Sequence, residues 1–247
     1  MLLYKFCSLR DKYTWENLIN HQLWFSNPND FNDPYDCKPN ILDTEFRLTS
    51  DTKIHFHEKD RELIYPCIQG QLHISCDIQE QIALELLNSY RICCFSSRYD
   101  SILMWSHYAE YHKGICLVFN TCNDFNFFSN CKNINYTRKR SKYSIGNHNE
   151  KVLLNKYVDW NYENEYRIIK SQQDVLSNSN SQIFVYTPKA LMEIIFGAKI
   201  EFSTIEEIIN RCQCAECLKH VVFSKMELAE TEEYQLLKLP IDKGNYL

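Results

Sequence analysis

Two glutamates, Glu163 and Glu165, form the most chemically suggestive pattern in the sequence. They lie in the strand-like tract Asp159–Ile169, DWNYENEYRII. Residues two apart in a strand share a face, so both carboxylates and Arg167 are expected to project the same way. Two neighbouring carboxylates can stabilise an oxocarbenium ion, hold a ribose hydroxyl, or act as acid and base. The alternative is a charge ladder on a solvated edge strand, with Arg167 as the ion-pair partner.

A second group of chemically versatile side chains occurs in the tract WSHYAEYH, which begins at Trp105. Its apolar spacing predicts a helix over Met104–His112, ended by a glycine. Trp105 and Tyr108 share one face of that helix, which is typical of core residues. His107 lies off this face and is paired with Tyr111 at i+4. A histidine among aromatic rings is either a binding residue or a satisfied structural one, and both readings remain open.

Three cysteines and a histidine near the C-terminus, Cys212, Cys214, Cys217 and His220, have a spacing that partly resembles a zinc site. A zinc ribbon needs a second Cys-x-x-Cys cluster, which the sequence lacks. On a helix the three cysteines would not all face one way. We therefore expect no metal site, and buried or reducible thiols are the alternative.

Composition limits the classes of function. The chain has 247 residues, of which 45% are hydrophobic and 14% aromatic, enough for one globular domain with a substantial core. The net charge of -5 argues against a general electrostatic grip on nucleic acid. The short basic run Arg138–Arg140 with Lys142 is typical of a solvated loop. There is no Gly-rich phosphate loop, no dinucleotide fingerprint and no hydrolase motif.

The start of the chain and its cysteines indicate a cytoplasmic location. The N-terminal residues MLLYK begin directly with strand-like sequence and lack the layout of a secretory signal. No apolar run approaches the length that spans a bilayer. Without export, most of the twelve cysteines should be reduced, small and apolar.

Strands and helices interleave without the regular rhythm of βαβ units, so we expect an α+β fold in a single domain, 1–247. A helical insertion is expected at about 45–90, and a C-terminal helical and strand extension from about 201. The expected helices are Tyr13–His21, Met104–His112, Lys189–Glu193 after Pro188, and Ser203–Arg211 with Ser203 as N-cap; Lys151–Val158 is helical or extended. The expected strands are Leu2–Cys7, Leu23–Ser26, Arg91–Ser96, Ile115–Phe119, Asn133–Tyr136, Glu165–Lys170, Phe184–Tyr186 and Ile194–Gly197. Turns are expected at Asn27–Asp36 and Asn178–Ser181.

Several ordered motifs together resemble the bacterial family known as domain of unknown function 2971. They are LYKF from Leu3, LWFSNP from Leu23, FNDPYD from Phe31, CFS from Cys94, MWSHYA from Met104, HKG from His112 and the tract from Trp160 to Arg167. The resemblance extends over roughly Leu3 to Ala198. The family label states no activity.

The same order of motifs more distantly resembles the ADP-ribosyltransferase superfamily. Those proteins place a catalytic glutamate on a late strand, often as Asn-Glu-Tyr, and Asn164-Glu165-Tyr166 fits there. In the first-strand motif this chain has Lys5 where a histidine is usual, and Phe6 where a glycine often stands. The implied fold has split antiparallel β-sheets with flanking helices, and NAD+ as a substrate lies in the cleft between them.

This resemblance implies an enzyme that modifies a macromolecular acceptor, either nucleic acid or protein, as bacterial toxins and anti-phage effectors do. A partner or antitoxin protein is then plausible, and a membrane is not involved. Glu165 is implied as the catalytic residue, with Glu163 as its helper. The implied cofactor-binding residues are Lys5, Ser26, Asn32, Asp33, Phe95, Ser96, Trp105, His107 and Tyr108. Phe95 or Trp105 would stack on nicotinamide, and Ser96 would hydrogen-bond the carboxamide or ribose.

Two other classes of function remain open. The same aromatic cleft could belong to a non-enzymatic regulatory domain that binds a nucleotide or a partner. Alternatively, Glu163, Glu165 and Asp33 could hold a divalent metal in a nuclease, although they do not form a recognised pattern.

Overall fold

The computed structural model describes residues 1–38, 84, 87–141, 150–171 and 182–242. Most of the helical insertion expected at 45–90, and the whole of the turn expected at Asn178–Ser181, lie outside these residues. The described residues form a mixed α+β structure, as expected, with strands and helices interleaved along the chain. None of the described helices has the length and apolar content that a membrane-spanning segment needs.

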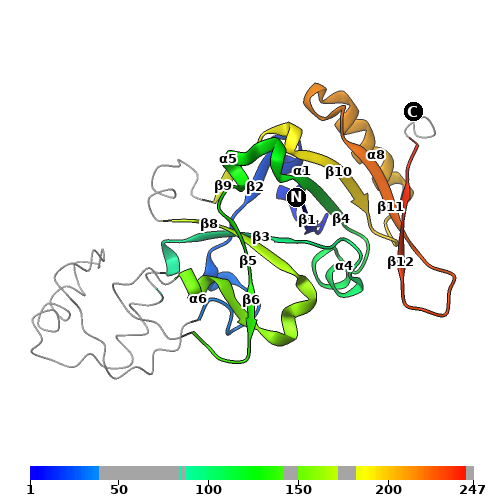
Figure 1. Ribbon diagram of the computed structural model, residues 1–247. Helices are drawn as coiled ribbons and strands as arrows, with labels where there is room; N and C mark the ends of the chain where they lie inside the picture. Colours follow the sequence, from blue (N-terminus) through cyan, green and yellow to red (C-terminus); the bar gives the residue numbers. More distant parts are fainter. Residues whose placement is uncertain (39–83, 85–86, 142–149, 172–181, 243–247) are drawn as a thin grey trace, which may run out of the picture.

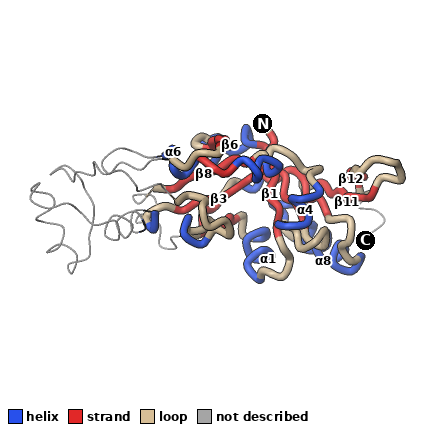
Figure 2. The backbone as a smooth tube through the Cα atoms, turned by 90° about the horizontal axis from the view of Figure 1, so that it is seen from below, coloured by secondary structure: helices blue, strands red, loops and turns tan. Residues whose placement is uncertain are grey.

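The described strands build one mostly antiparallel sheet of eight strands in the order β12-β11-β10-β4-β1-β3-β8-β5. Only β10 and β11 run parallel to each other in it. Figure 1 and Figure 2 both place the β11–β12 hairpin on the side of the described structure opposite α6. The bounds are β1 Leu2–Cys7, β3 Arg91–Ser96, β4 Ile115–Asn120, β5 Cys131–Asn133, β8 Glu165–Lys170, β10 Leu191–Phe196, β11 Val222–Leu228 and β12 Leu236–Pro240.

Two small sheets and short helices flank the main sheet. Strands β2 (Gln22–Trp24) and β9 (Ile183–Val185) pair with each other, as do β6 (Asn135–Thr137) and β7 (Asn155–Tyr157). The α-helices are α1 Lys12–Ile19, α4 Ile102–Tyr108, α5 Phe125–Phe128, α6 Glu150–Leu154 and α8 Phe202–Cys214. The 3-10 helices are η1 Pro28–Asp30, η2 Thr121–Asp124, η3 Val158–Glu163, η4 Pro188–Ala190 and η5 Glu216–Leu218.

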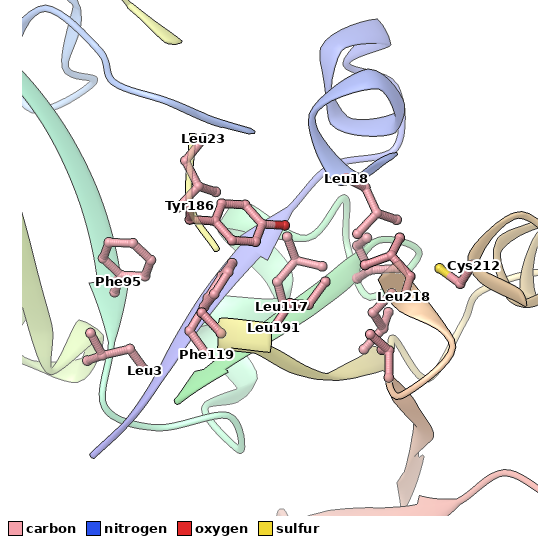
Figure 3. Packing of buried hydrophobic residues seen from close by; sticks show 14 of the residues in the cluster. Leu3, Leu18, Leu23, Phe95, Leu117, Phe119, Tyr186, Leu191, Cys212 and Leu218 are labelled. Atoms are coloured by element: carbon pink, nitrogen blue, oxygen red, sulfur yellow. The ribbon is translucent and has the colours of Figure 1, made fainter. Parts of the chain in front are cut away.

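The largest hydrophobic core lies on one face of the sheet. Alternate residues of the central strands point there, such as Leu3 and Phe95, and α1, α5 and α8 cover them. Leu18 of α1 and Cys212 of α8 belong to this core (Figure 3). Tyr186 is almost wholly buried in it, at 1% exposure. Burial of these side chains is the main force that fixes the sheet and its covering helices.

The opposite face of the central strands supports a different layer. Tyr4 and Phe6 of β1 point to this face and pack against α4, where Phe6 meets Trp105 edge to face at 5.1 Å between ring centroids. Strand β1 pairs with β4 along its whole length, from Leu2 to Cys7. With β3 it shares, among the described strands, the single register pair Tyr4 with Ser96. The sheet is therefore weakly joined between β1 and β3.

Several expected elements are confirmed with small shifts of their ends. The strands at Leu2–Cys7, Arg91–Ser96 and Glu165–Lys170 are as expected, and Asp11 caps α1 by accepting a hydrogen bond from the Tyr13 amide. The segment expected to be helical or extended at Lys151–Val158 is both, because α6 is followed directly by β7.

Three expectations are wrong in detail. The helix expected at Lys189–Glu193 is limited to the 3-10 turn η4, and Leu191 already begins β10. Helix α8 begins after Glu201, without a side-chain cap, so Ser203 is not its N-cap. Ser26 lies beyond β2 and makes an isolated bridge to Ile92.

Helix α4 ends at Tyr108, before the expected His112, because the backbone turns into the left-handed region. Glu110, Tyr111 and His112 have φ of 51, 56 and 71°. The amide of His112 donates to the carbonyl of Trp105 at 3.1 Å, and that of Gly114 donates to Ala109 at 2.8 Å. This tight corner sends the chain back into β4.

Candidate active site

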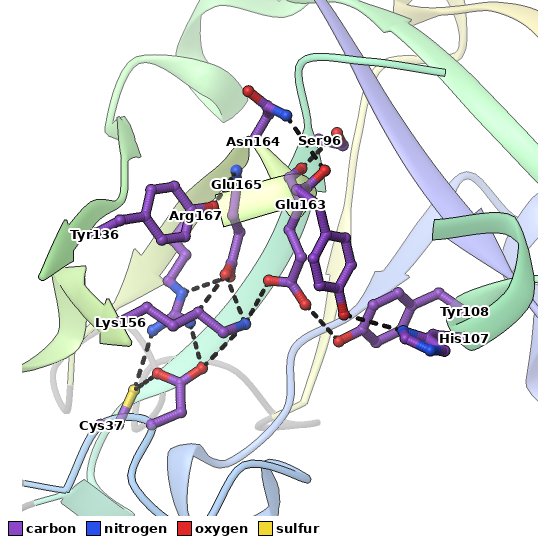
Figure 4. A network of polar contacts seen from close by, with 12 residues as sticks. Cys37, Ser96, His107, Tyr108, Tyr136, Lys156, Glu163, Asn164, Glu165 and Arg167 are labelled. Carbon is purple, nitrogen blue, oxygen red and sulfur yellow. Dashed lines mark hydrogen bonds and ion pairs between the residues drawn. The ribbon is translucent and has the colours of Figure 1, made fainter. Parts of the chain in front are cut away.

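Lys156, in the short strand β7, is the centre of a buried polar network (Figure 4). Its ammonium lies 2.5 Å from Glu163 Oε2, 3.0 Å from Glu165 Oε2 and 3.3 Å from Asp36 Oδ2. The Lys156 side chain is 5% exposed. A charge this far from water is stable only when it is paired. Burial lowers the pKa of Lys156, but the carboxylates, led by Glu165, outweigh this and raise it above its ordinary value.

Arg167, in β8, is the second cation of the network and is fully buried. Its Nε donates to Glu165 Oε1 at 2.6 Å, and its Nη2 donates to Asp36 Oδ2 at 2.6 Å. A further nitrogen donates to the carbonyl of Leu153 at 2.8 Å. The guanidinium also lies over the ring of Phe31, 5.2 Å from its centroid. Arg167 thus fixes Glu165 and connects the loop after η1 to the sheet.

Glu163 ends η3 and does not lie in the strand. Asn164 follows it with φ 45°, a left-handed conformation that asparagine tolerates well, and β8 then begins at Glu165. The expectation that both glutamates project from one strand is therefore wrong. The expected charge ladder on a solvated edge is also wrong, since Glu163 and Glu165 are 3% and 4% exposed. The turn at Asn164 nevertheless leads both carboxylates to the same ammonium, that of Lys156.

The two carboxyl groups differ in their electrostatic surroundings. Burial raises the pKa of Glu163 to about 7, with Lys156 opposing this effect and the Glu165 charge adding to it. Burial also acts on Glu165, but Arg167 and Lys156 outweigh it and hold the pKa of Glu165 well below its ordinary value. Glu163 can therefore gain or lose a proton near neutral pH, while Glu165 stays ionised. Two carboxyl groups with separated pKa values are typical of acid–base sites.

Glu163 is held on its other side by helix α4. The hydroxyl of Tyr108 donates to Glu163 Oε1 at 2.6 Å. The backbone carbonyl of Glu163 accepts from the Ser96 hydroxyl, also at 2.6 Å. The backbone amide of Glu165 donates to the Tyr136 hydroxyl at 2.8 Å. The pair is thus fixed by side chains from α4, β3 and β6.

A cavity of about 440 Å³ opens beside this network, in the size range of small-molecule sites, about 300–1,000 Å³. It is bounded by β1, β3 and β8, by α4, and by the loop around Phe31. Eight of the eleven site residues expected from the sequence line it: Lys5, Asn32, Phe95, Ser96, His107, Tyr108, Glu163 and Glu165.

The other three expected residues do not line the cavity. Trp105 is fully buried, and its indole nitrogen donates to the Tyr99 carbonyl at 2.6 Å, so it belongs to the core. Asp33 accepts from the Tyr35 amide at 2.8 Å and stabilises a turn. Ser26 is engaged with Ile92 through two backbone hydrogen bonds of 2.9 Å.

Two of the residues that line the cavity are placed differently from expectation. Phe95 is 2% exposed, and its ring packs against Phe119 and Phe128, so core side chains already contact its ring. His107 is exposed and its Nδ1 lies 2.9 Å from the Tyr162 hydroxyl. The expected pairing of His107 with Tyr111 is therefore not what the structure shows, because the backbone turns left-handed after α4.

Lys5 reaches the cavity from the junction between β1 and β3. Its ammonium donates to the Cys94 carbonyl at 3.3 Å and lies 5.6 Å from the centroid of Phe95. No carboxylate among the described residues forms an ion pair with it. Lys5 thus lines the cavity, and its ammonium, unlike the charged groups of Lys156 and Arg167, has no carboxylate partner among the described residues.

Sequence reasoning did not assign Lys156 and Asp36 to the site. Asp36 ends the loop motif FNDPYD, so its place in that motif was a usable signal. Lys156 had no such signal, because its partners are Asp36, Glu163 and Glu165, brought together only by the fold.

The cysteines near the C-terminus do not converge. Cys212 is buried in α8, while Cys214 and Cys217 are exposed. His220 Nε2 lies 2.9 Å from the Leu191 carbonyl. The part of the chain that the structure describes contains no group of three or more residues arranged to hold a metal ion.

Comparisons with known proteins inform only part of these assignments. No curated protein and no solved structure matches the chain, so they give no support to the ADP-ribosyltransferase resemblance. The resemblance expected from Leu3 to Ala198 is confirmed over a shorter segment, which runs from α4 to β8 and contains Tyr108 and Glu163. Over residues 104–168 the chain matches the family described as Protein of unknown function (DUF2971).

Proposed function

We propose that the protein binds NAD+ in this cavity and transfers the ADP-ribosyl group to a macromolecular acceptor. Glu163 is the catalytic carboxylate in this proposal. The observation that supports this most is the environment of Glu163. It is buried at the cavity, bonded by Tyr108 and Lys156, and its pKa is raised to about 7. A carboxyl group tuned in this way suits acid–base work at neutral pH.

In the proposed reaction the bond between nicotinamide and ribose breaks, and nicotinamide leaves with the bonding electron pair. The ribose carbon becomes oxocarbenium-like, and ionised Glu163 stabilises that positive charge. An oxygen or nitrogen of the acceptor then forms the new bond to ribose. Glu163 accepts the proton that the acceptor loses, so the products are nicotinamide, the modified acceptor and one proton.

This proposal exchanges the roles expected for the two glutamates. Glu165 accepts hydrogen bonds from Arg167 and Lys156, so both of its oxygens are engaged. Glu163 has one oxygen on Lys156 and the other on Tyr108, whose hydroxyl can rotate away. Glu163 is therefore the better candidate to meet a ligand, and Glu165 positions Lys156.

Two further features support a nucleotide ligand. Lys5 supplies a positive charge for a phosphate or ribose oxygen. The described strands form one continuous main sheet and not the split sheets expected from the resemblance, but the junction between β1 and β3 beside the cavity has a single register pair, which would let these strands part around a ligand.

A non-enzymatic nucleotide-binding domain is the second candidate. Lys156 and Arg167 are internally compensated by Asp36, Glu163 and Glu165, so the network is complete without turnover. A metal-dependent nuclease has less support. Asp33 lies outside the cavity, and cationic side chains already engage the glutamate oxygens that a metal would need.

The decisive experiment follows NAD+ labelled in its adenylate part, incubated with the protein and a cell lysate. We expect label on a macromolecule and release of nicotinamide, both measured by chromatography. Glu163→Gln should lower both by at least about 100-fold. Glu193→Gln is the matched control, since Glu193 is a partly buried glutamate paired with Lys238 far from this network.

The outcomes separate the candidates. If NAD+ raises the unfolding midpoint but no nicotinamide is released with any lysate, the protein binds NAD+ without acting on it, and the non-enzymatic candidate is the correct one. If NAD+ neither binds nor is consumed, the protein is neither an ADP-ribosyltransferase nor a binding domain for NAD+.

A further inference from the structure

Outside the cavity, the structure brings a cysteine and a histidine into direct contact. The Nε2 atom of His21 lies 3.1 Å from the sulfur of Cys217. The two residues are 196 positions apart in the chain. His21 lies at the corner between α1 and β2, and Cys217 lies in η5, after α8. The contact is therefore a product of the tertiary fold.

His21 is held in a fixed position. Its backbone has φ 54°, and its carbonyl accepts from the Tyr186 amide at 2.8 Å. Its ring meets the ring of Tyr186 edge to face, with centroids 6.0 Å apart. An imidazole that is oriented by a neighbour is one requirement for assisting a nucleophile.

Of the two ring nitrogens of His21, Nε2 is the one that contacts a side chain able to exchange a proton. Its Nδ1 is buried and has no hydrogen-bond partner among the described residues. Proton exchange with a neighbour must therefore occur through Nε2, the atom that faces Cys217. Burial lowers the pKa of His21, and the nearby His220 adds to this, which favours the neutral ring that can accept a proton.

A second unpartnered polar group lies in the same region. The hydroxyl of Tyr186 is buried and has no hydrogen-bond partner among the described residues. Burial raises the pKa of this hydroxyl, and the thiols of Cys7, Cys212 and Cys217 lie close enough to raise it further. Tyr186 belongs to the main core, as does Cys212 (Figure 3).

Among the described cysteines, three are exposed: Cys122, Cys214 and Cys217. Cys37, Cys93, Cys116 and Cys212 are buried. Cys214 is exposed like Cys217, but it has no hydrogen-bond partner among the described residues. The sulfur of Cys122 lies 4.0 Å from the N-terminal ammonium, so of the three exposed thiols among the described residues only Cys217 contacts an imidazole.

We propose that Cys217 is a reactive thiol, assisted by His21, that takes small electrophiles and is oxidised by peroxides. With a peroxide the sulfur attacks one peroxide oxygen, and the oxygen–oxygen bond breaks. His21 Nε2 takes the thiol proton and returns it to the leaving oxygen. The products are a sulfenic acid on Cys217 and an alcohol or water, so the peroxide is reduced as the sulfur is oxidised. This site does not depend on the function proposed for the cavity.

The test is a timed alkylation of the full chain with iodoacetamide, followed by mass spectrometry of the peptides that contain Cys214 and Cys217. We expect Cys217 to react at least about tenfold faster than Cys214 in the folded protein. In urea the two rates should converge. Equal rates in the folded protein would overturn the proposal. With hydrogen peroxide and dimedone, the sulfenic acid adduct should form on Cys217, and an adduct only at other cysteines would also overturn it.

His21→Asn tests the role of the imidazole, because asparagine tolerates the left-handed backbone at this position. The variant should bring the alkylation rate of Cys217 down to that of Cys214 and leave the Cys214 rate unchanged. An unaltered ratio would show that His21 gives no assistance. If the variant does not fold, the comparison of folded and urea-unfolded wild-type protein still decides whether the folded structure activates Cys217.

Discussion

Tyr108 and Glu163, 55 residues apart in the sequence, are joined by a hydrogen bond of 2.6 Å from the phenol to the carboxylate. The bond connects α4 to η3 across the cavity, and both residues lie in the segment that matches the family. The phenol stabilises the ionised form of Glu163. It therefore opposes the effect of burial on the pKa of Glu163.

Loss of this phenol should shift the pH profile of the proposed transfer reaction. In the wild type, kcat/KM should rise with pH through about 7, because the active form of Glu163 is the ionised one. Tyr108→Phe removes a donor to that form, so the midpoint should move upward by about one pH unit. Tyr162→Phe is the matched control, since the Tyr162 hydroxyl contacts His107 and should leave the midpoint in place. A midpoint that moves downward, or moves equally in both variants, contradicts the assignment.

The stability of Glu163→Gln relative to the wild type should depend on pH. The pKa of Glu163 in the folded protein is about 7, above its ordinary value of 4.5. Between these two values the folded state holds the proton more tightly than the unfolded state, so the stability that Glu163 contributes falls as pH rises through this window. The whole effect is at most about 3 kcal/mol.

Glutamine remains neutral at every pH, so the variant does not lose stability as pH rises through this window. The difference between the unfolding midpoints of variant and wild type should therefore increase in favour of the variant from pH 4.5 to pH 7. Calorimetry at several pH values measures it. A difference that is constant with pH, or that decreases, would mean that Glu163 does not have the raised pKa.

Removal of the Arg167 side chain should be strongly destabilising. Arg167→Ala leaves Glu165 and Asp36 buried, with only Lys156 to compensate both charges. Breaking a buried network on one side costs about 3–5 kcal/mol. Arg211→Ala is the matched control, because Arg211 makes an exposed pair with Glu207 whose loss costs at most about 1 kcal/mol. Urea unfolding compares the two, and similar losses would refute the structural role of Arg167.

Gly114→Ala should destabilise the corner between α4 and β4. A Cβ at this position would lie 2.3 Å from the Cys7 carbonyl oxygen, a backbone atom that cannot move without disturbing β1. We expect the free energy of unfolding to fall by about 1–3 kcal/mol. Lys113→Ala, at the exposed neighbouring position, should change the unfolding midpoint little. An unchanged midpoint for Gly114→Ala would show that the corner can open without cost.

The strands of the site could be predicted because their residues alone determine them. Arg91–Ser96 and Glu165–Lys170 are rich in β-prone residues, and both form strands with the expected bounds.

The end of α4 could not be predicted. Glu110, Tyr111 and His112 adopt left-handed backbone conformations that such residues rarely prefer, and contacts with distant residues compensate, such as the Lys199 amide on the His112 carbonyl.

The polar network shows the same limit. Glu163 and Glu165 are close because they are two residues apart in the sequence, but the sequence does not show that their pKa values differ. It arises from Arg167 engaging one carboxylate and Tyr108 the other, and these donors come from a strand and a helix. A pattern of residue types therefore indicated where chemistry could occur, and only the fold showed which carboxyl group can titrate.

The junction between β1 and β3 has a consequence for motion. Because the described parts of these strands share one register pair, Tyr4 with Ser96, little backbone hydrogen bonding protects the amide hydrogens there. We expect amide hydrogens at this junction to exchange with solvent sooner than those between β1 and β4, which pair along six residues. A ligand that bridges the two strands would slow this exchange. Hydrogen exchange at the junction would then report occupancy of the cavity without any knowledge of the reaction.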